Sequence, residues 1–230
     1  MIRLVVVDID GTLTRWRGDL LLSIEAIEAV RMLEDRGIRV SLSSGNSLPV
    51  TAGVARYIGA RGPVIGENGC LILYRQRLIH VCRGRPGEDL ISKLTSIGLR
   101  ESWQNTFRFH DLSFNAPQGR EDLLVEGARI AREMGYEAFL SGYALHIQPA
   151  GGGKGAGLLK TVQLLGLDPR EVLAVGDGEN DIPMLVTAGY SAAPSDADDR
   201  VKRVASYVAS KPGGQGFREV VEELILRQTT

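Results

Sequence analysis

The hydrophobic pattern of the chain predicts short buried strands that alternate with amphipathic helices. Leu4–Val7 is rich in β-branched residues and has no polar position, which is typical of a central strand covered on both faces. From Ser23 to Gly37 apolar residues recur at helical spacing, and these two residues are suited to cap the helix ends. The first third therefore predicts a parallel α/β layer with a hairpin attached. The later elements expected in this third are a strand at Ile38–Leu42, a helix from Pro49 to Ile58, a strand at Val64–Ile65 and a hairpin at Leu71–Val81.

The pattern changes between residues 84 and 151. Gly84–Gly87 contains two glycines and a proline, which favours a hinge, and Ala150–Gly153 forms a second flexible junction. Helical and β-prone segments are mixed between the two junctions, as expected for an inserted domain. We therefore expect a core of residues 1–83 and 152–230 and an inserted α+β cap of residues 84–151. The segments expected in the cap are a helix ending at Ile97, a β-prone run at Phe107–Phe114, a helix at Gln118–Met134 and strands at Glu137–Leu140 and Ala144–Gln148.

The α/β alternation resumes after this insert, so the fold class is α/β. We expect a Rossmann-like parallel sheet core with helices on both faces. The expected elements are helices at Gly155–Leu165, Ile182–Ala188 and Gly216–Leu226, and strands at Val172–Val175, Tyr190–Ala193 and Tyr207–Ala209.

Acidic residues follow two of the predicted strands. Asp8 and Asp10 come directly after the first strand, and Asp177 and Asp181 follow the strand at Val172–Val175. The carboxyl ends of parallel strands meet at one edge of a sheet, where ligands bind. One acidic pair could be no more than a polar turn, but four clustered carboxylates need a divalent cation to offset their repulsion, and oxygen ligands suit Mg²⁺. The sequence therefore predicts a Mg²⁺ site.

Lys154 stands at the expected start of a helix, where its charge opposes the helix dipole, and this position favours a ligand-binding role. A hard metal, carboxylates and a lysine together indicate phosphate chemistry, in which the cations neutralise the phosphoryl oxygens while a carboxylate attacks phosphorus. A nucleotide-hydrolysing P-loop is excluded, because Gln148 and Gly155 stand where that motif needs glycine and Ser or Thr.

Composition narrows the class of protein. The 230 residues are 43% hydrophobic and 24% charged with a formal net charge of -1, so neither nucleic acid nor a membrane surface is an expected partner. A long apolar run and a secretory signal are both lacking, which favours a cytoplasmic protein. Cys70 and Cys82 are expected to remain reduced thiols. His80, His110 and His146 lack ligand spacing, so a zinc site is not expected.

Four segments resemble the signature motifs of the haloacid dehalogenase-like phosphatases. They are Asp8–Thr12, Ser44, Lys154 and Gly176–Asp181, in the order and spacing of that family. The insert resembles the type 2 cap of its Cof-like branch, and its compact size together with Ser44–Asn46 is most similar to the archaeal-type phosphoglycolate phosphatases. Many Cof-like members have Thr-Gly-Arg at the second motif, so the asparagine at position 46 departs from the wider pattern.

This resemblance implies a role for each matching residue. Asp8 would attack phosphorus and form an aspartyl-phosphate, and Asp10 would protonate the leaving alkoxide and then activate water. Ser44 and Lys154 would bind the phosphoryl oxygens, with Asn180 orienting the site. The implied metal ligands are Asp8, Asp10 (through its backbone carbonyl), Asp177 and Asp181, and the implied substrate-binding residues are Ser44, Lys154 and Asn180.

The expected function is thus a Mg²⁺-dependent phosphatase that hydrolyses a small phosphorylated metabolite, with 2-phosphoglycolate implied by the resemblance. A broad-specificity sugar-phosphate phosphatase, a phosphotransferase such as a phosphomutase, and a non-catalytic protein of the same fold remain alternatives. The cap residues Arg108, His110 and Asp111 are candidates for specificity, although such residues more often lie at the surface. A homodimer is possible, and the apolar hairpin could either form its interface or pack under the cap.

Overall fold

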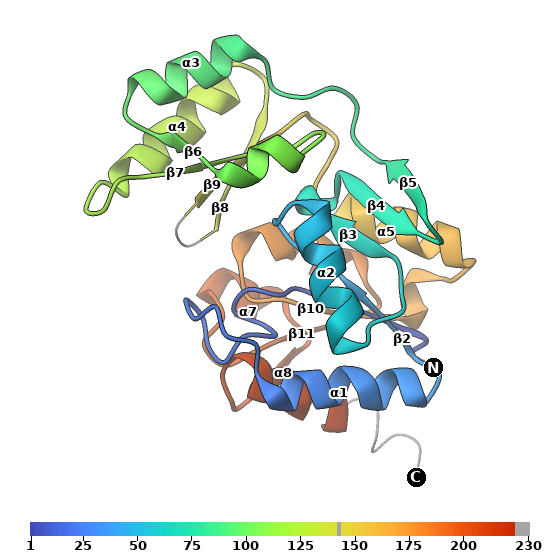
Figure 1. The fold of residues 1–230 in the computed structure, drawn as a ribbon. Coiled ribbons are helices and arrows are strands. Elements are labelled where there is room, and N and C mark those ends of the chain that lie inside the picture. Colours follow the sequence, from blue (N-terminus) through green and yellow to red (C-terminus); the bar gives the residue numbers. More distant parts are fainter. Residues whose placement is uncertain (142–143, 224–230) are drawn as a thin grey trace.

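The computed structural model describes residues 1–141 and 144–223, which form an α/β unit with a smaller α+β unit above it (Figure 1). The centre of the larger unit is a five-stranded sheet of order β12-β11-β10-β1-β2 in which every neighbouring pair is parallel. The chain passes from β1 to β2 on one side and later from β10 to β11 on the other. The carboxyl ends of β1 and β10 therefore form the switch point at which such sheets bind ligands. The strands are β1 (Leu4–Val7), β2 (Arg39–Leu42), β10 (Val172–Val175), β11 (Tyr190–Ala193) and β12 (Tyr207–Val208).

Helices cover both faces of this sheet, because successive side chains of a buried strand point in opposite directions. Val5 and Val7 of β1 belong to the apolar core shared with α1, α2 and α8. Leu4 and Val6 belong to the core shared with α5, α6 and α7. This arrangement confirms the predicted Rossmann-like sheet. The helices are α1 (Ile24–Asp35), α2 (Leu48–Ile58), α5 (Lys154–Leu165), α6 (Ile182–Thr187), α7 (Asp199–Val204) and α8 (Gly213–Val221).

The predicted hairpin forms a small sheet of its own with the preceding strand. β3 (Val64–Gly66) pairs antiparallel with β4 (Leu71–Tyr74), which pairs antiparallel with β5 (Arg77–His80). A single parallel bridge between Ser43 and Ile65 joins this sheet to the large one. β2 ends one residue before the bridge, so β3 takes most of its partners from the hairpin instead of from the parallel layer.

The smaller unit is a four-stranded antiparallel sheet of order β6-β7-β9-β8 with two helices packed on one face (Figure 1). Its apolar core includes Leu112 and Phe114 of β7 and Leu145 and Ile147 of β9, together with residues of α3 and α4. The alternate positions of β7 and β9 point toward the larger unit. The elements are α3 (Glu88–Ser96), β6 (Arg100–Glu101), β7 (Leu112–Asn115), α4 (Asp122–Glu133), β8 (Glu137–Ser141) and β9 (Ala144–Gln148).

Several element ends differ from the sequence-based expectation. The helix expected from Gln118 begins at Asp122 because residues 118–121 are taken up by turns. The expected C-terminal helix begins at Gly213, and the part of that prediction beyond residue 223 lies outside the described residues. The domain boundaries at residues 83/84 and 151/152 stay predictions. Short 3₁₀ turns complete the described chain at Glu67–Gly69, Trp103–Phe107, Pro169–Glu171 and Glu179–Asp181. Within the described ranges, no helix combines the length and the apolar character needed to cross a membrane.

Cys70 and Cys82 form a disulfide with their Cα atoms 4.8 Å apart, so the expectation of two reduced thiols is wrong. The backbone beyond the hairpin explains the pairing. Leu71 lies opposite His80, so Val81 follows opposite Cys70. The backbone N–H groups of Val81 (2.9 Å) and Cys82 (3.3 Å) both donate to Cys70 O, which brings Cys82 next to Cys70. The disulfide also touches the second junction, since a Cβ atom at Gly152 would lie 2.7 Å from Cys82 Sγ.

Replacing both cysteines by serine should lower the free energy of unfolding by about 2–3 kcal/mol, because the bond closes a short loop in the unfolded chain. Unfolding by guanidinium chloride with and without a reductant would measure this. Reductant should weaken the wild type and leave the double variant unchanged. Equal midpoints for the wild type and the double variant without reductant would contradict a stabilising disulfide.

Candidate active site

Three buried carboxylates meet where β1 and β10 end. Asp8 directly follows the last residue of β1, and Asp177 follows Gly176 after the end of β10. The backbone N–H of Asp8 donates to Val175 O at 3.0 Å. Asp181 reaches the same point from the 3₁₀ turn at Glu179–Asp181. One oxygen from each carboxylate lies within 4.8 Å of the others. The structure therefore brings together three of the four predicted acidic residues through their side chains.

Glycines allow the two loops to approach so closely. Gly11 has φ +85°, and a Cβ atom there would lie 2.4 Å from Asp177 Oδ2. A Cβ atom at Gly176 would lie 2.5 Å from Asp181 Cγ. Asp181 Oδ2 in turn accepts hydrogen bonds from the backbone N–H groups of Asp177 (3.0 Å) and Gly178 (2.9 Å). A side chain at either glycine would force the carboxylates apart.

Lys154 occupies the centre of this acidic group. Its Nζ lies 2.6 Å from Asp8 Oδ1 and 2.6 Å from Asp181 Oδ1, and the whole residue is 1% exposed. Burial alone would lower the pKa of Lys154, but the charges of Asp181 and Asp8 outweigh it and hold that pKa above its usual value. The lysine at the start of α5 therefore stays charged and balances part of the negative charge.

The remaining negative charge is costly to bury. Burial, followed by the charge of Asp181, raises the pKa of Asp8 well above its usual value, although Lys154 opposes the shift. Burial and Asp181 also raise the pKa of Asp177 to about 7, against the opposing charge of Arg17, whose Nε lies 3.3 Å from Asp177 Oδ2. Clustered hard oxygen donors in this electrostatic state fit a divalent cation such as Mg²⁺. The residues that would hold it are Asp8, Asp177 and Asp181.

Asp10 lies outside that group, and its carboxylate has a different set of contacts. Asp10 Oδ2 accepts a hydrogen bond from Asn46 Nδ2 at 2.9 Å. The same amide also donates to Ser44 Oγ at 3.1 Å, so Asn46 connects two predicted site residues. Burial is the main cause that raises the pKa of Asp10, and Lys154 and Asn46 oppose it. A half-buried carboxyl group of raised pKa is suited to proton transfer.

A cavity of about 570 Å³ separates the two units above these residues. Asp8, Asp10, Asp177 and Asn180 line it from below, whereas Ser44, Lys154 and Asp181 do not line it. The sheet of the smaller unit forms the opposite wall. The residues that line the cavity from this side are Ser102, Trp103, Gln104, Arg108, Ser113, Asn115, Ser141, Ala144 and His146.

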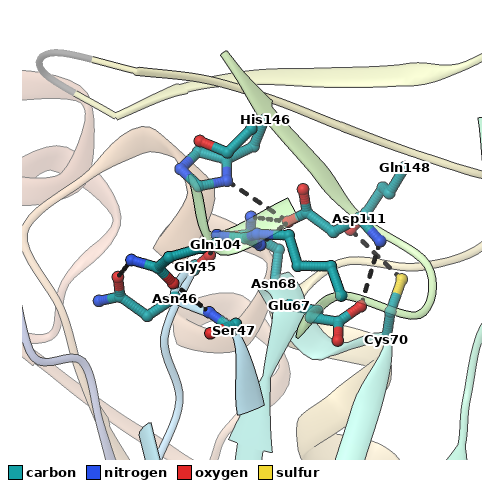
Figure 2. Close-up of polar contacts among 12 residues, drawn as sticks. Gly45, Asn46, Ser47, Glu67, Asn68, Cys70, Gln104, Asp111, His146 and Gln148 are labelled. Carbon is teal, nitrogen blue, oxygen red and sulfur yellow. Dashed lines mark hydrogen bonds and ion pairs between the residues drawn. The ribbon is translucent and has the colours of Figure 1, made fainter. Parts of the chain in front are cut away.

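Polar contacts join the two walls of the cavity, and sequence reasoning missed most of their residues (Figure 2). Gln104 Nε2 donates to Asn46 Oδ1 at 2.9 Å, and Gln104 Oε1 accepts from the Ser47 backbone N–H at 2.8 Å. Asn68 Nδ2 donates to Asp111 Oδ2 at 2.7 Å, while Asn68 Oδ1 accepts from Asn180 Nδ2 at 3.0 Å. Asn180 thus contacts Asn68, and its predicted role in orienting the site stays a prediction.

The candidates for specificity are not surface residues. Arg108 is 4% exposed, His110 is 7% exposed and Asp111 is fully buried, so the expectation for them was wrong. A signal for Asn68 was present in the sequence, because it follows the strand at Val64–Gly66 in the way Ser44 follows its own strand. His146 had no such signal, since its position depends on the register of the antiparallel sheet.

Several known proteins are similar to this chain in sequence. A family model described as haloacid dehalogenase-like hydrolase matches residues 5–94 and 131–220. A protein named phosphoglycolate phosphatase from Aeropyrum pernix is 44% identical over 224 residues, which cover 97% of this chain and 94% of that protein. A protein of the same name from Metallosphaera sedula is 40% identical over 225 residues, which cover 98% of this chain and 100% of that protein.

Solved structures show the same fold over the full length. The crystal structure of a protein from Thermoplasma acidophilum has a TM-score of 0.88 at 29% identity, covering 98% of this chain and 99% of the other. A haloacid dehalogenase-like hydrolase from Bacteroides thetaiotaomicron has a TM-score of 0.79 at 22% identity, covering 98% and 100%. The latter likeness concerns the fold alone.

Metal-free protein should lose stability as the pH rises, through the contribution of Asp177. The folded state binds a proton on Asp177 more tightly than the unfolded state, so this contribution is complete below pH ~4 and is lost as the pH approaches 7. Asp177→Asn cannot ionise. In EDTA, its unfolding midpoint relative to the wild type should therefore rise between pH 5 and pH 8.

Asp122→Asn is the matched control for this experiment. Asp122 is an exposed carboxylate whose hydrogen bond from Arg120 holds its pKa below the usual value, so it stays ionised across the range. The midpoint of this variant relative to the wild type should not change between pH 5 and pH 8. If the midpoint of Asp177→Asn relative to the wild type is also constant between pH 5 and pH 8, the electrostatic account is wrong. Adding Mg²⁺ at pH 8 should raise the wild-type midpoint more than that of Asp177→Asn.

Proposed function

The chain belongs to the haloacid dehalogenase-like hydrolases and is a phosphoric monoester hydrolase, and we propose that it cleaves 2-phosphoglycolate to glycolate and phosphate through an aspartyl-phosphate. The observation that carries the mechanism is the contact of Lys154 Nζ with Asp8 Oδ1 at 2.6 Å. This contact keeps a buried carboxylate paired at the floor of the cavity, which is what a carboxylate nucleophile requires.

In the first step, an oxygen of Asp8 attacks phosphorus and the bond from phosphorus to the glycolate oxygen breaks. The raised pKa of Asp10 supports its role as the acid that protonates this leaving oxygen. In the second step, Asp10 takes a proton from water as the water attacks the phosphorus of the aspartyl-phosphate. Phosphate then leaves, and Asp8 returns to its carboxylate form. The hydrogen bond from Asn46 orients Asp10 for both proton transfers.

Asp8, Asp177 and Asp181 would hold Mg²⁺ in this reaction, and their clustered oxygens support that assignment. When bound, the ion supplies positive charge that offsets these carboxylates and the phosphoryl oxygens. Lys154 adds a second positive charge through its contacts with Asp8 and Asp181. Ser44 Oγ accepts hydrogen bonds from the backbone N–H (3.0 Å) and Nδ2 (3.1 Å) of Asn46, and its contact with a phosphoryl oxygen stays a prediction.

The choice of 2-phosphoglycolate rests on the relatives that carry this substrate in their names at 40–44% identity over nearly the whole chain. The smaller unit forms one wall of the cavity, so its residues can contact the leaving group and exclude water. The cytoplasmic location stays a prediction.

Asp8→Asn should abolish phosphate release from 2-phosphoglycolate, since an amide cannot act as the nucleophile. Asp10→Asn should lower kcat by about 10²–10⁴-fold, the usual contribution of a general acid or base. EDTA should inactivate the wild type, and Mg²⁺ should restore it. Phosphate in solution is the readout, because transfer to a second sugar instead would indicate a phosphotransferase.

Asp19→Asn is the control, because Asp19 lines the same cavity but pairs with Arg15 outside the acidic group. Its activity should remain within about threefold of the wild type, as surface substitutions away from reacting groups usually do. Full activity of Asp8→Asn would overturn the mechanism. Comparable turnover of many sugar phosphates would overturn the substrate assignment and leave a broad-specificity phosphatase.

A further inference from the structure

The guanidinium group of Arg108 is buried at the cavity without a full set of partners. Its side chain is 1% exposed, and Nε and Nη1 lack a hydrogen-bond partner among the described residues. We propose that Arg108 binds the carboxylate of the substrate and thereby makes the enzyme specific for carboxylate-bearing phosphomonoesters. This inference rests on the proposed function and assigns its specificity to one side chain.

The position of the Arg108 guanidinium is defined by contacts on two sides. Nη2 donates to Gly45 O at 2.9 Å, which places the group next to the loop that carries Ser44. Nη1 lies 3.4 Å from Asp111 Oδ2. Nη1 and this carboxylate form an ion pair without hydrogen-bond geometry, and Asp111 Oδ1 is likewise buried without a hydrogen-bond partner among the described residues. The guanidinium group is therefore held in place, while its Nε and Nη1 still lack hydrogen-bond acceptors among the described residues.

Glu67 of the larger unit holds the loop that carries this arginine. Its carboxylate accepts hydrogen bonds from the backbone N–H groups of Phe109 (3.0 Å), His110 (2.8 Å) and Asp111 (3.2 Å). Three successive N–H groups around one carboxylate fix the backbone directly after Arg108 (Figure 2 labels Glu67 and Asp111). A rigid loop lowers the cost of ordering the side chain when a ligand binds.

His146 lies beside this group on β9 and provides another unpartnered nitrogen. Its Nδ1 is 3.4 Å from Asp111 Oδ2 and lacks a hydrogen-bond partner in the described part of the chain (Figure 2). The ring also comes close to the loop below, because a Cβ atom at Gly45 would lie 3.2 Å from His146 Cε1. Arg108 and His146 both line the cavity that Asp8 and Asp10 line from the opposite side.

The unsatisfied nitrogens indicate an anionic acceptor. A buried charged donor that lacks an acceptor is destabilising, and a ligand oxygen removes that penalty on binding. The phosphoryl group is assigned to the floor of the cavity at Asp8, so the anion at Arg108 is the other end of the substrate. In 2-phosphoglycolate that end is a carboxylate. A substrate that lacks it would leave Nε and Nη1 of Arg108 without a hydrogen-bond acceptor, which gives strong discrimination.

The test compares 2-phosphoglycolate with 2-hydroxyethyl phosphate, which has the same number of carbons but a neutral hydroxymethyl group in place of the carboxylate. Arg108→Met should lower the ratio of kcat/KM for the two substrates about 100-fold, through loss on 2-phosphoglycolate alone, because removing one partner of a buried charge pair costs this much or more. Arg108→Lys, which keeps the charge but not the planar donors, should lower the ratio about tenfold.

Arg120→Met is the matched control. Arg120 is an exposed arginine whose guanidinium pairs with Asp122, and it does not line the cavity. Its loss should leave the substrate ratio within about threefold of the wild type. An unchanged ratio in both Arg108 variants, or an equal loss in Arg120→Met, would overturn the inference while the phosphatase function stands. Absence of phosphate release by the wild type from either substrate would instead overturn the proposed function.

Discussion

The burial of three carboxylates against one lysine is the constraint on which the rest of the structure depends. Asp8, Asp177 and Asp181 lie within 4.8 Å of one another, and Lys154 supplies one positive charge against three negative ones. Such a group is unstable in a folded chain unless protons or a cation complete the balance. The raised pKa of Asp177 expresses this imbalance. This unfavourable burial of like charges is located at the edge of the sheet where parallel sheets bind ligands.

The same group ties the two units of the molecule together. Lys154 is the first residue of α5 and directly follows the glycine-rich junction at the end of the smaller unit. Gly69 of the larger unit allows this junction to approach, since a Cβ atom there would lie 2.1 Å from Gly153 O. The disulfide lies at the same junction, against Gly152. These close approaches hold the start of α5, and with it Lys154, against the larger unit.

The core of the site could be predicted from the sequence because it depends on local rules. Buried strands end at defined residues, and parallel strand ends converge, so Asp8 and Asp177 had to meet. Arg108 and His146 depend instead on the register of an antiparallel sheet and on how that sheet sits above the core, which no local pattern encodes. The disulfide is an intermediate case. The hairpin was predicted, and it brings the chain near Cys82 back to Cys70, but the usual redox state of intracellular cysteines favoured free thiols.

Asn46 shows how the two walls of the cavity depend on each other. Its amide nitrogen donates to Asp10 and Ser44, while its oxygen accepts from Gln104 of the smaller unit. An arginine at this position, as in many Cof-like proteins, would bring a positive charge from the core. In this chain the residue is neutral, and the guanidinium of Arg108 reaches the same loop from above through Gly45 O. The proposed recognition of the substrate by Arg108 and the orientation of Asp10 by Asn46 therefore depend on one interface between the two units.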